Sequence, residues 1–170
     1  MNRRILLALL LAAPVAAFAP IAAFAPVAAF AQSDPKGPQP ELAKEHLTIV
    51  TSDGQRHNFD VEVARTQQQQ ITGLMYRTKV APNGGMLFVW PSPITSQMWM
   101  EHTLVPLDMV FIKADGTIDS IAENTVPQSL RIVASHGKVT ATLELAGGTT
   151  RRLGITVGDK VEGAMFHPGR

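Results

Sequence analysis

The 170-residue sequence contains no cysteine. This absence excludes a disulfide framework, catalysis by a cysteine thiolate and attachment to a membrane through a lipidated cysteine. The stability of the folded chain must therefore come from a packed core. A domain of roughly 120 residues can bury about two-thirds of the surface that its unfolded chain exposes, which is sufficient for such a core.

Sequence motifs of several enzyme classes are also missing. The chain has no Gly-x-Ser-x-Gly elbow, no His-Glu-x-x-His pair, no phosphate-binding Gly-x-x-x-x-Gly-Lys loop and no Gly-x-Gly-x-x-Gly fingerprint. The histidines are scattered without the spacing of metal ligands, at His46, His57, His102, His136 and His167. These absences favour a protein that is not an enzyme. An envelope hydrolase with an unrecognised site, for example His102 with Asp108 and a serine, stays open as an alternative.

Charge of one sign does not dominate the chain. Lysine and arginine number 15, aspartate and glutamate 14, and the formal net charge is +1. There is no run of basic residues, so the sequence gives no indication of a nucleic-acid partner.

The first 31 residues have the pattern of a secretory signal. Arg3 and Arg4 precede an apolar run over residues 5–13, and a hexapeptide then recurs three times over residues 13–30. A basic start, an apolar segment and a small-x-small cleavage site together are typical of a signal peptide. Each repeat ends in Phe followed by Ala, which offers three Ala-Phe-Ala cleavage sites.

The residue after each Ala-Phe-Ala site distinguishes the three. Pro20 and Pro26 follow the first two, and proline locks the backbone and lacks an N–H group, which fits an extended-binding protease poorly. Gln32 follows the third site, so we predict cleavage after Ala31. Loss of the two arginines would change the formal charge from +1 to −1.

An uncleaved membrane anchor is the alternative for this N-terminal segment. Residues 5–31 are long enough to span a bilayer, but prolines every six residues argue against a spanning helix. We therefore expect a periplasmic or secreted protein with no stable membrane insertion after cleavage.

The rest of the chain predicts a short linker and a single domain. Residues 32–45 are rich in proline and poor in apolar side chains, which indicates a flexible tether before a domain at residues 46–167. Alternating apolar residues at 47–51 and 59–64, joined through Asp53-Gly54, predict a β-hairpin. Thr66 and Gln69 have the spacing of a capping box, which predicts a short helix with Ile71, Leu74 and Met75 on its buried side.

Short apolar runs separated by glycine, proline and aspartate continue to the end of the chain. They predict strands at residues 86–90, 97–103, 108–113, 118–122, 139–145 and 160–166, a loop at 91–93, and a short turn or helix at 151–153. This pattern indicates an all-β fold with minor helix, a β-sandwich or jelly-roll-like barrel with one or two short helices.

Seven stretches of the chain form a set of motifs in a fixed order, namely Val61-Glu-Val-Ala64, Gly73-Leu-Met-Tyr-Arg77, Gly85-Met-Leu-Phe88, Trp99-Met100 with Thr103-Leu-Val-Pro-Leu-Asp108, Asp115-Gly116, Leu143-Glu-Leu145 and Gly158-Asp159. This set resembles the signature of the family called "domain of unknown function 192". The resemblance covers nearly all of residues 47–166. It implies a compact β-sandwich of jelly-roll type, often exported, without an agreed function. The chain departs from the family at Glu101 and His102, where a basic residue followed by Asn is usual.

The densest group of these motifs predicts a polar pocket beside Trp99. Arg77 would bind an anion, Trp99 would stack on a ring, and His102, Thr103 and Asp108 would complete the ligand-binding site, because binding groups are often displayed beside turns. The alternative is structural: an Arg77–Asp108 ion pair orders the following loop, and Trp99 belongs to the core.

A copper site is a second hypothesis for the same segment. In a strand over residues 97–103, the side chains of Met98, Met100 and His102 would share one face. Thioether and imidazole ligands suit Cu(I). Against this, methionine commonly fills gaps in apolar cores. No other cofactor is indicated.

Two glutamates lie within the predicted strands. Glu62 and Glu144 fall on the polar phase of alternating segments, so we expect both side chains on solvated strand faces. Together these features predict an exported binding or accessory domain of the cell envelope. Its partner would be a small molecule or an envelope protein.

Overall fold

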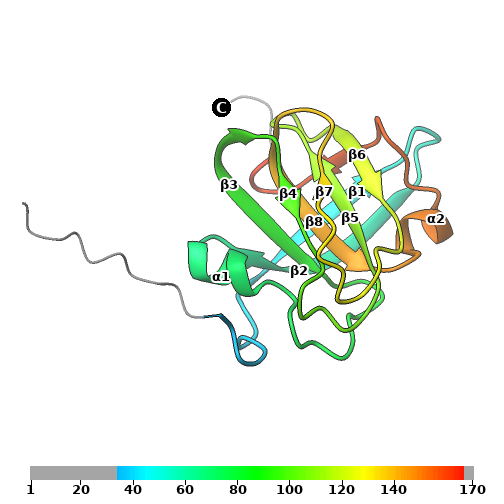
Figure 1. The fold of residues 1–170 in the computed structure, drawn as a ribbon. Coiled ribbons are helices and arrows are strands. Elements are labelled where there is room, and N and C mark those ends of the chain that lie inside the picture. Colours follow the sequence, from blue (N-terminus) through cyan, green and yellow to red (C-terminus); the bar gives the residue numbers. More distant parts are fainter. Residues whose placement is uncertain (1–33, 167–170) are drawn as a thin grey trace, which may run out of the picture. The chain divides into compact units, whose positions relative to one another are not determined.

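The computed structural model describes residues 34–166. It contains nine strands and two short helices. The strands are β1 (Lys44–Val50), β2 (Arg56–Ala64), β3 (Met86–Ile94), β4 (Gln97–Met98), β5 (Leu107–Ile112), β6 (Ile118–Ala122), β7 (Val133–Ala134), β8 (Val139–Ala146) and β9 (Lys160–Glu162). The helices are α1 (Gln67–Thr72) and α2 (Thr149–Leu153), and Figure 1 shows them at different ends of the sheet. The predicted all-β class with one or two short helices is confirmed.

One seven-stranded sheet with the order β6-β5-β8-β3-β2-β1-β9 carries most of the fold. β4 and β7 form a separate two-stranded sheet. An isolated bridge between Thr117 and Lys160 links the two edges of the large sheet, but the sheet does not close into a barrel. None of the helices within residues 34–166 is long and apolar enough to cross a membrane.

The predicted hairpin and capping box are both present. β1 and β2 pair antiparallel, and Thr66 caps α1 by accepting a hydrogen bond from the backbone N–H of Gln69, whose side chain accepts one from the N–H of Thr66. β2 and β3 then pair in parallel, so the chain between them must cross from one end of the sheet to the other. This crossover, residues 65–85, contains α1.

Several predicted boundaries are wrong. β3 continues to Ile94 through the proline-containing segment predicted as a loop, and its pairing with β8 shifts register between Val89 and Ile94. Proline cannot donate to a ladder, so a register shift there fits its chemistry. The strand predicted at 97–103 is only β4, Gln97–Met98, and the last strand ends at Glu162. β1 begins at Lys44, inside the predicted linker.

The predicted linker makes further contacts with the domain. The side-chain amide of Gln39 donates hydrogen bonds to the carbonyl oxygens of Gln69 and Gly73, at 3.1 and 2.9 Å. The Tyr76 hydroxyl donates to the carbonyl oxygen of Pro35 at 2.7 Å. The described part of this segment is therefore held against α1 and the residues that follow it.

Apolar clusters cover both faces of the large sheet. The first includes Leu47, Val61, Leu143 and Val110 among its buried members. The second contains three methionines, and its buried members are Met86, Phe88, Met100, Met109, Phe111, Leu74, Leu107, Ala64 and Val139. Because β5 is buried on both sides, it reads as a nearly continuous apolar run interrupted only by Asp108.

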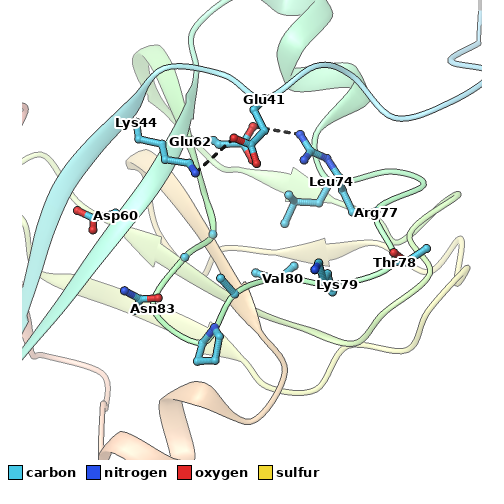
Figure 2. Close-up of a pocket in the computed structure, with 14 residues that line it drawn as sticks. Glu41, Lys44, Asp60, Glu62, Leu74, Arg77, Thr78, Lys79, Val80 and Asn83 are labelled. Carbon is cyan, nitrogen blue, oxygen red and sulfur yellow. Dashed lines mark hydrogen bonds and ion pairs between the residues drawn. The ribbon is translucent and has the colours of Figure 1, made fainter.

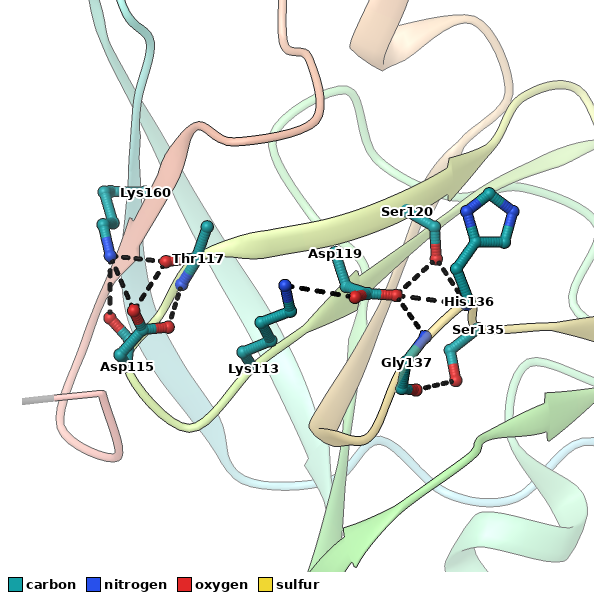
Figure 3. Close-up of polar contacts among 9 residues, drawn as sticks. All are labelled: Lys113, Asp115, Thr117, Asp119, Ser120, Ser135, His136, Gly137 and Lys160. Atoms are coloured by element: carbon teal, nitrogen blue, oxygen red, sulfur yellow. Dashed lines mark hydrogen bonds and ion pairs between the residues drawn. The ribbon is translucent and has the colours of Figure 1, made fainter.

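Two aspartates fasten the β5–β6 hairpin to its neighbours (Figure 3). Asp115 in the hairpin turn accepts hydrogen bonds from the backbone and side chain of Thr117 and pairs with Lys160 of β9, and these contacts lower its pKa. Asp119 accepts from the backbone N–H groups of His136 and Gly137 and lies 3.3 Å from Lys113. The two clusters hold the edge strand β6 in place.

Candidate functional site

The second face of the sheet carries a row of alternating carboxyl and thioether side chains. Cross-strand partners run from Glu62 in β2 to Met86 in β3, Glu144 in β8 and Met109 in β5. Residues directly opposite each other on one face of a sheet are in contact range. Both glutamates are buried, with 7% and 4% of their surface exposed. The prediction that they lie on solvated strand faces is therefore wrong.

A polar cleft lies at the Glu62 end of this row. It has a volume of about 740 Å³, and it is lined by Glu41, Lys44, Asp60, Glu62, Leu74, Arg77, Thr78, Lys79, Val80, Ala81, Pro82, Asn83, Gly84 and Gly85. Figure 2 shows Arg77 directed toward Glu62 and Lys44 directed toward Glu41. Charged groups of both signs thus face each other across the cleft.

The Glu62 carboxylate has two partners within the protein. Its Oε2 accepts a hydrogen bond from Arg77 Nη2 at 3.1 Å and another from the backbone N–H of Leu42 at 2.8 Å. The Arg77 side chain is itself mostly buried, at 19% exposure. A buried carboxylate is tolerated when it has such a counter-ion and a second donor.

An aromatic pocket lies at the Glu144 end of the row. Its volume is about 280 Å³, and it is lined by Gln67, Gln70, Ile71, Thr72, Gly73, Leu74, Met75, Phe88, Trp90, Gln97, Met98, Trp99, Thr103 and Glu144. Leu74 lines both hollows and so forms part of the partition between them. Both tryptophans of the sequence line this pocket.

Glu144 is the only ionisable residue in the lining of the aromatic pocket. Among residues 34–166, no hydrogen bond and no charged neighbour contributes to the pKa of its carboxyl group. Burial alone raises its pKa to about 8, because the charged form has lost water and gained no partner. At neutral pH this side chain is therefore mostly a neutral carboxylic acid, able to donate as well as accept a hydrogen bond.

The sheet side of the pocket is fixed by packing and hydrogen bonds. The rings of Phe88 and Trp90 stack with centroids 6.2 Å apart, and Trp90 Nε1 donates to Thr142 Oγ1 at 3.3 Å. Thr142 also hydrogen-bonds the buried hydroxyl of Ser96 at 3.0 Å. On the helix side, Gln70 donates its amide to the carbonyl oxygen of Val89 at 2.6 Å.

The loop that carries Trp99 is clamped to the segment after α1. The rings of Tyr76 and His102 stack with centroids 5.0 Å apart, and the backbone N–H of Tyr76 donates to the carbonyl oxygen of His102 at 2.8 Å. Both residues have positive φ angles, 62° and 53°, which are uncommon for side chains of this size and require support from their surroundings. The clamp keeps Trp99 beside Met75 at the pocket.

The structure separates the five residues predicted as a ligand site. Trp99 and Thr103 line the aromatic pocket, and Trp99 is 49% exposed rather than part of the core. His102 does not line the aromatic pocket, and its ring stacks on that of Tyr76. Arg77 belongs to the polar cleft, where it pairs with Glu62 and not with Asp108.

Asp108 is placed to organise the protein rather than to face either hollow. Its side chain is completely buried, and its two oxygens accept hydrogen bonds from the backbone N–H groups of Asn124, Gly148 and Thr150 and from the Thr150 hydroxyl, all at 2.8–2.9 Å. A carboxylate offers about four acceptor positions, and these contacts fill them. Asp108 thus joins β5 to the start of α2 and to the loop after β6.

The methionines of the copper hypothesis both pack in the second cluster but differ in exposure. Met98 is partly buried and lines the aromatic pocket, whereas Met100 is fully buried and its sulfur accepts a hydrogen bond from the Thr125 hydroxyl at 3.1 Å. Because the strand ends at Met98, the assumption that strand alternation places Met98, Met100 and His102 on one face is wrong. Within the described residues, no group of three His, Cys, Asp or Glu side chains is placed to hold a metal ion.

Glu144 was grouped with Arg77, His102, Thr103 and Asp108 from the sequence but was not kept as a site residue, because a polar position in a strand was interpreted as an exposed one. The available signal was its position inside Leu143-Glu-Leu145, one of the stretches that resemble a family motif. Alternation along the strand places Glu144 on the face opposite to Leu143 and Leu145. Both faces of the sheet are covered by apolar clusters, so Glu144 is buried as well.

Comparison with known proteins assigns the chain to a family. The family model DUF192, described as "Uncharacterized ACR", matches residues 48–163. The chain belongs to the DUF192 family. A crystal structure of a proposed transcription regulator from Sinorhizobium meliloti 1021 is 45% identical, with a TM-score of 0.72 over 74% of this chain and 98% of that one. No curated protein matches the chain.

A second solved structure is also similar to this chain. A protein of unknown function from Novosphingobium aromaticivorans DSM 12444 is 40% identical, with a TM-score of 0.69 over 71% of this chain and 86% of that one. The match to the family model confirms the family that the sequence motifs resembled.

Proposed function

We propose that this DUF192 protein is a binding module that holds a small organic molecule in the aromatic pocket. The observation that carries the proposal is the combination of aromatic walls with a buried, unpartnered carboxyl group in the pocket lining. Ligand pockets are typically concave and mostly apolar, with a few polar groups and perturbed pKa values. The Glu144 carboxyl group lines the pocket and has no protein partner among residues 34–166, so a bound molecule would supply one.

The polar cleft is a weaker choice for the binding site. It is larger, but its Glu62 carboxylate already accepts hydrogen bonds from Arg77 and from the backbone N–H of Leu42, so a ligand would have to compete with existing contacts. Nucleic-acid binding, which the name of the S. meliloti relative raises, has little support in a chain with a formal charge of +1 and no basic run.

We further propose that binding takes place outside the cytoplasm, on the basis of the N-terminal signal pattern in residues 1–31. Those residues lie outside the part of the chain that the structure describes. Expression of the full chain followed by fractionation and intact-mass measurement tests this proposal. We expect a periplasmic or secreted protein that begins at Gln32; a full-length chain in the cytoplasm would contradict it.

Intrinsic fluorescence offers a direct test of the binding site, because both tryptophans line the pocket. A panel of small cations, anions and neutral compounds should contain at least one class that changes the emission saturably and raises the thermal midpoint. A compound at about 100 times its dissociation constant adds roughly 2.7 kcal/mol to the unfolding free energy. For a domain of this size that corresponds to several degrees.

Two variants test whether the compound that changes the fluorescence binds in the aromatic pocket. Trp99→Ala should weaken binding of the active class at least tenfold, with emission from Trp90 as the remaining signal. Val157→Ala, which truncates an exposed apolar residue that does not line the pocket, should leave binding unchanged. The proposal fails if no class produces a response, or if Trp99→Ala leaves the affinity of every active compound unaltered.

A further inference from the structure

We infer that the aromatic pocket selects small organic cations, which its Glu144 carboxylate and its tryptophan faces would bind together. This inference rests on the proposed function and adds the chemical class of the ligand. Three properties of the pocket carry it: the sign of its charge, the chemistry of its walls and the absence of an internal counter-ion among the described residues.

The described residues that line the pocket include one ionisable side chain, which can carry a negative charge. Glu144 supplies it, and the remaining lining residues are apolar or neutral. An anionic ligand would therefore meet no arginine, lysine or histidine in the lining and would be repelled by any ionised Glu144. A cation would supply the counter-charge that the protein does not provide. Breaking a buried ion pair leaves an uncompensated charge, and completing one removes that cost.

The charged groups nearest to the pocket do not alter this balance. Glu62 lies two strands away in the same row, and Arg77 already pairs with it. Glu101 and His102 belong to the Trp99 loop but do not line the pocket. The direct cross-strand neighbours of Glu144 are Met86 and Met109, which carry no charge.

The walls of the pocket suit a cation with an apolar surface. Phe88, Trp90 and Trp99 provide three aromatic rings, and Met75 and Met98 add polarisable thioethers. Aromatic faces attract cations, tryptophan most strongly, and quaternary ammonium ions are commonly held in such surroundings. The volume of about 280 Å³ is at the small end of ligand pockets, which limits the ligand to a compact molecule.

Binding of a cation would compete with the proton on Glu144. In the empty pocket the carboxyl group keeps its proton to about pH 8, so a bound cation must displace it at neutral pH. The affinity for a permanent cation should therefore rise about tenfold per pH unit below that pKa and level off above it. A neutral ligand that accepts a hydrogen bond from the protonated acid would show the opposite trend.

The test compares choline with dimethylbutanol, in which carbon replaces the quaternary nitrogen, so that the two probes share a shape and differ in charge. Tryptophan fluorescence titrations of the full-length protein at pH 6, 7, 8 and 9 give both affinities. We expect choline to bind at least tenfold more tightly at pH 8 and to lose affinity toward pH 6, while dimethylbutanol varies little. Calorimetry in two buffers should detect proton release on choline binding at pH 7.

Glu144→Gln is the decisive variant, because it keeps the shape of the side chain and removes its ionisation. It should bind choline more weakly than the unmodified protein does at pH 8, and its affinity for choline should no longer vary with pH. The inference is overturned if dimethylbutanol binds as tightly as choline to the unmodified protein, or if neither probe binds. Binding of dimethylbutanol or of another neutral compound would leave the proposed function standing, so the two failures are distinguishable.

Discussion

Glu62 and Glu144 lie in one row of the same sheet, separated by Met86, and both are buried. The carboxylate of Glu62 receives Arg77 and the N–H of Leu42, whereas that of Glu144 receives no protein group among residues 34–166. The first arrangement is what a structural ion pair requires. The second leaves a polar group unsatisfied at a hollow large enough for a small molecule. The comparison shows that burial alone does not distinguish the two carboxyl groups, whereas the presence of a protein partner does.

Of the substitutions that test this comparison, removal of Arg77 should change the unfolding free energy most. Arg77→Met keeps most of the side-chain volume but leaves Glu62 buried without a counter-ion, and we expect a loss of about 3–5 kcal/mol in the unfolding free energy. Chemical denaturation at pH 7 measures it. Lys79→Met is the matched control, since Lys79 lines the same cleft but is exposed, and its effect should be below about 0.5 kcal/mol. Equal effects of the two variants would show that the Arg77–Glu62 pair is not structural.

The two glutamates should respond to neutralisation with opposite signs. The folded protein keeps the Glu144 proton to about pH 8, whereas the ordinary pKa of an exposed glutamate is 4.5, so between these values the folded state binds more protons than the unfolded state. Its stability must then fall as pH rises through this window. Glu144→Gln removes this loss and should stabilise the protein at pH 8 by about 2 kcal/mol or more.

Glu62→Gln is the counterpart, because it weakens the contact with Arg77. We expect it to destabilise the protein by about 1–3 kcal/mol across the same pH range. Denaturation curves at pH 5, 6, 7 and 8 for the two variants and the unmodified protein separate the cases. Destabilisation by both substitutions at pH 8 would contradict the distinction between a paired and an unpaired carboxyl group.

Loss of a hydrogen bond that supports the pocket wall should lower the unfolding free energy by a smaller amount. Thr142→Val removes the hydroxyl that accepts from Trp90 Nε1 and bonds to Ser96, which should cost about 1–2 kcal/mol. The Trp90 emission should also shift, because its indole N–H loses a fixed partner. Thr117→Val, in the β5–β6 turn, removes a comparable hydroxyl contact far from both tryptophans along the chain and should leave their emission unchanged. An unaltered spectrum in Thr142→Val would mean that this bond does not position the wall.

The parts of the fold that could be predicted from sequence are those fixed by local chemistry. The hairpin of β1 and β2 follows from period-two alternation around Asp53-Gly54, and the start of α1 follows from the Thr66–Gln69 capping box. β4 could not be bounded in the same way. Residues 99–103 leave the strand because the Tyr76–His102 clamp holds them against a segment about 25 positions earlier in the chain.

The candidate site was predicted only in part, for a similar reason. Trp99 and Thr103 were singled out and do line the aromatic pocket, but Glu144 was assigned to solvent. Alternation along β8 separates its two faces correctly. The alternation does not indicate whether α1 and the segment at residues 73–76 cover the second face of the sheet. That long-range packing is what buries Glu144.

The most direct test of this account is the pKa of Glu144 itself, measured by NMR titration of the side-chain carboxyl carbons. Glu144→Gln identifies the resonance. The account predicts a pKa near 8 in the empty pocket and a lower value when choline is present. A pKa close to 4.5 would contradict it. A carboxyl group with an ordinary pKa must already be hydrated or hydrogen-bonded by the protein, so a cation would not supply a partner that it lacks.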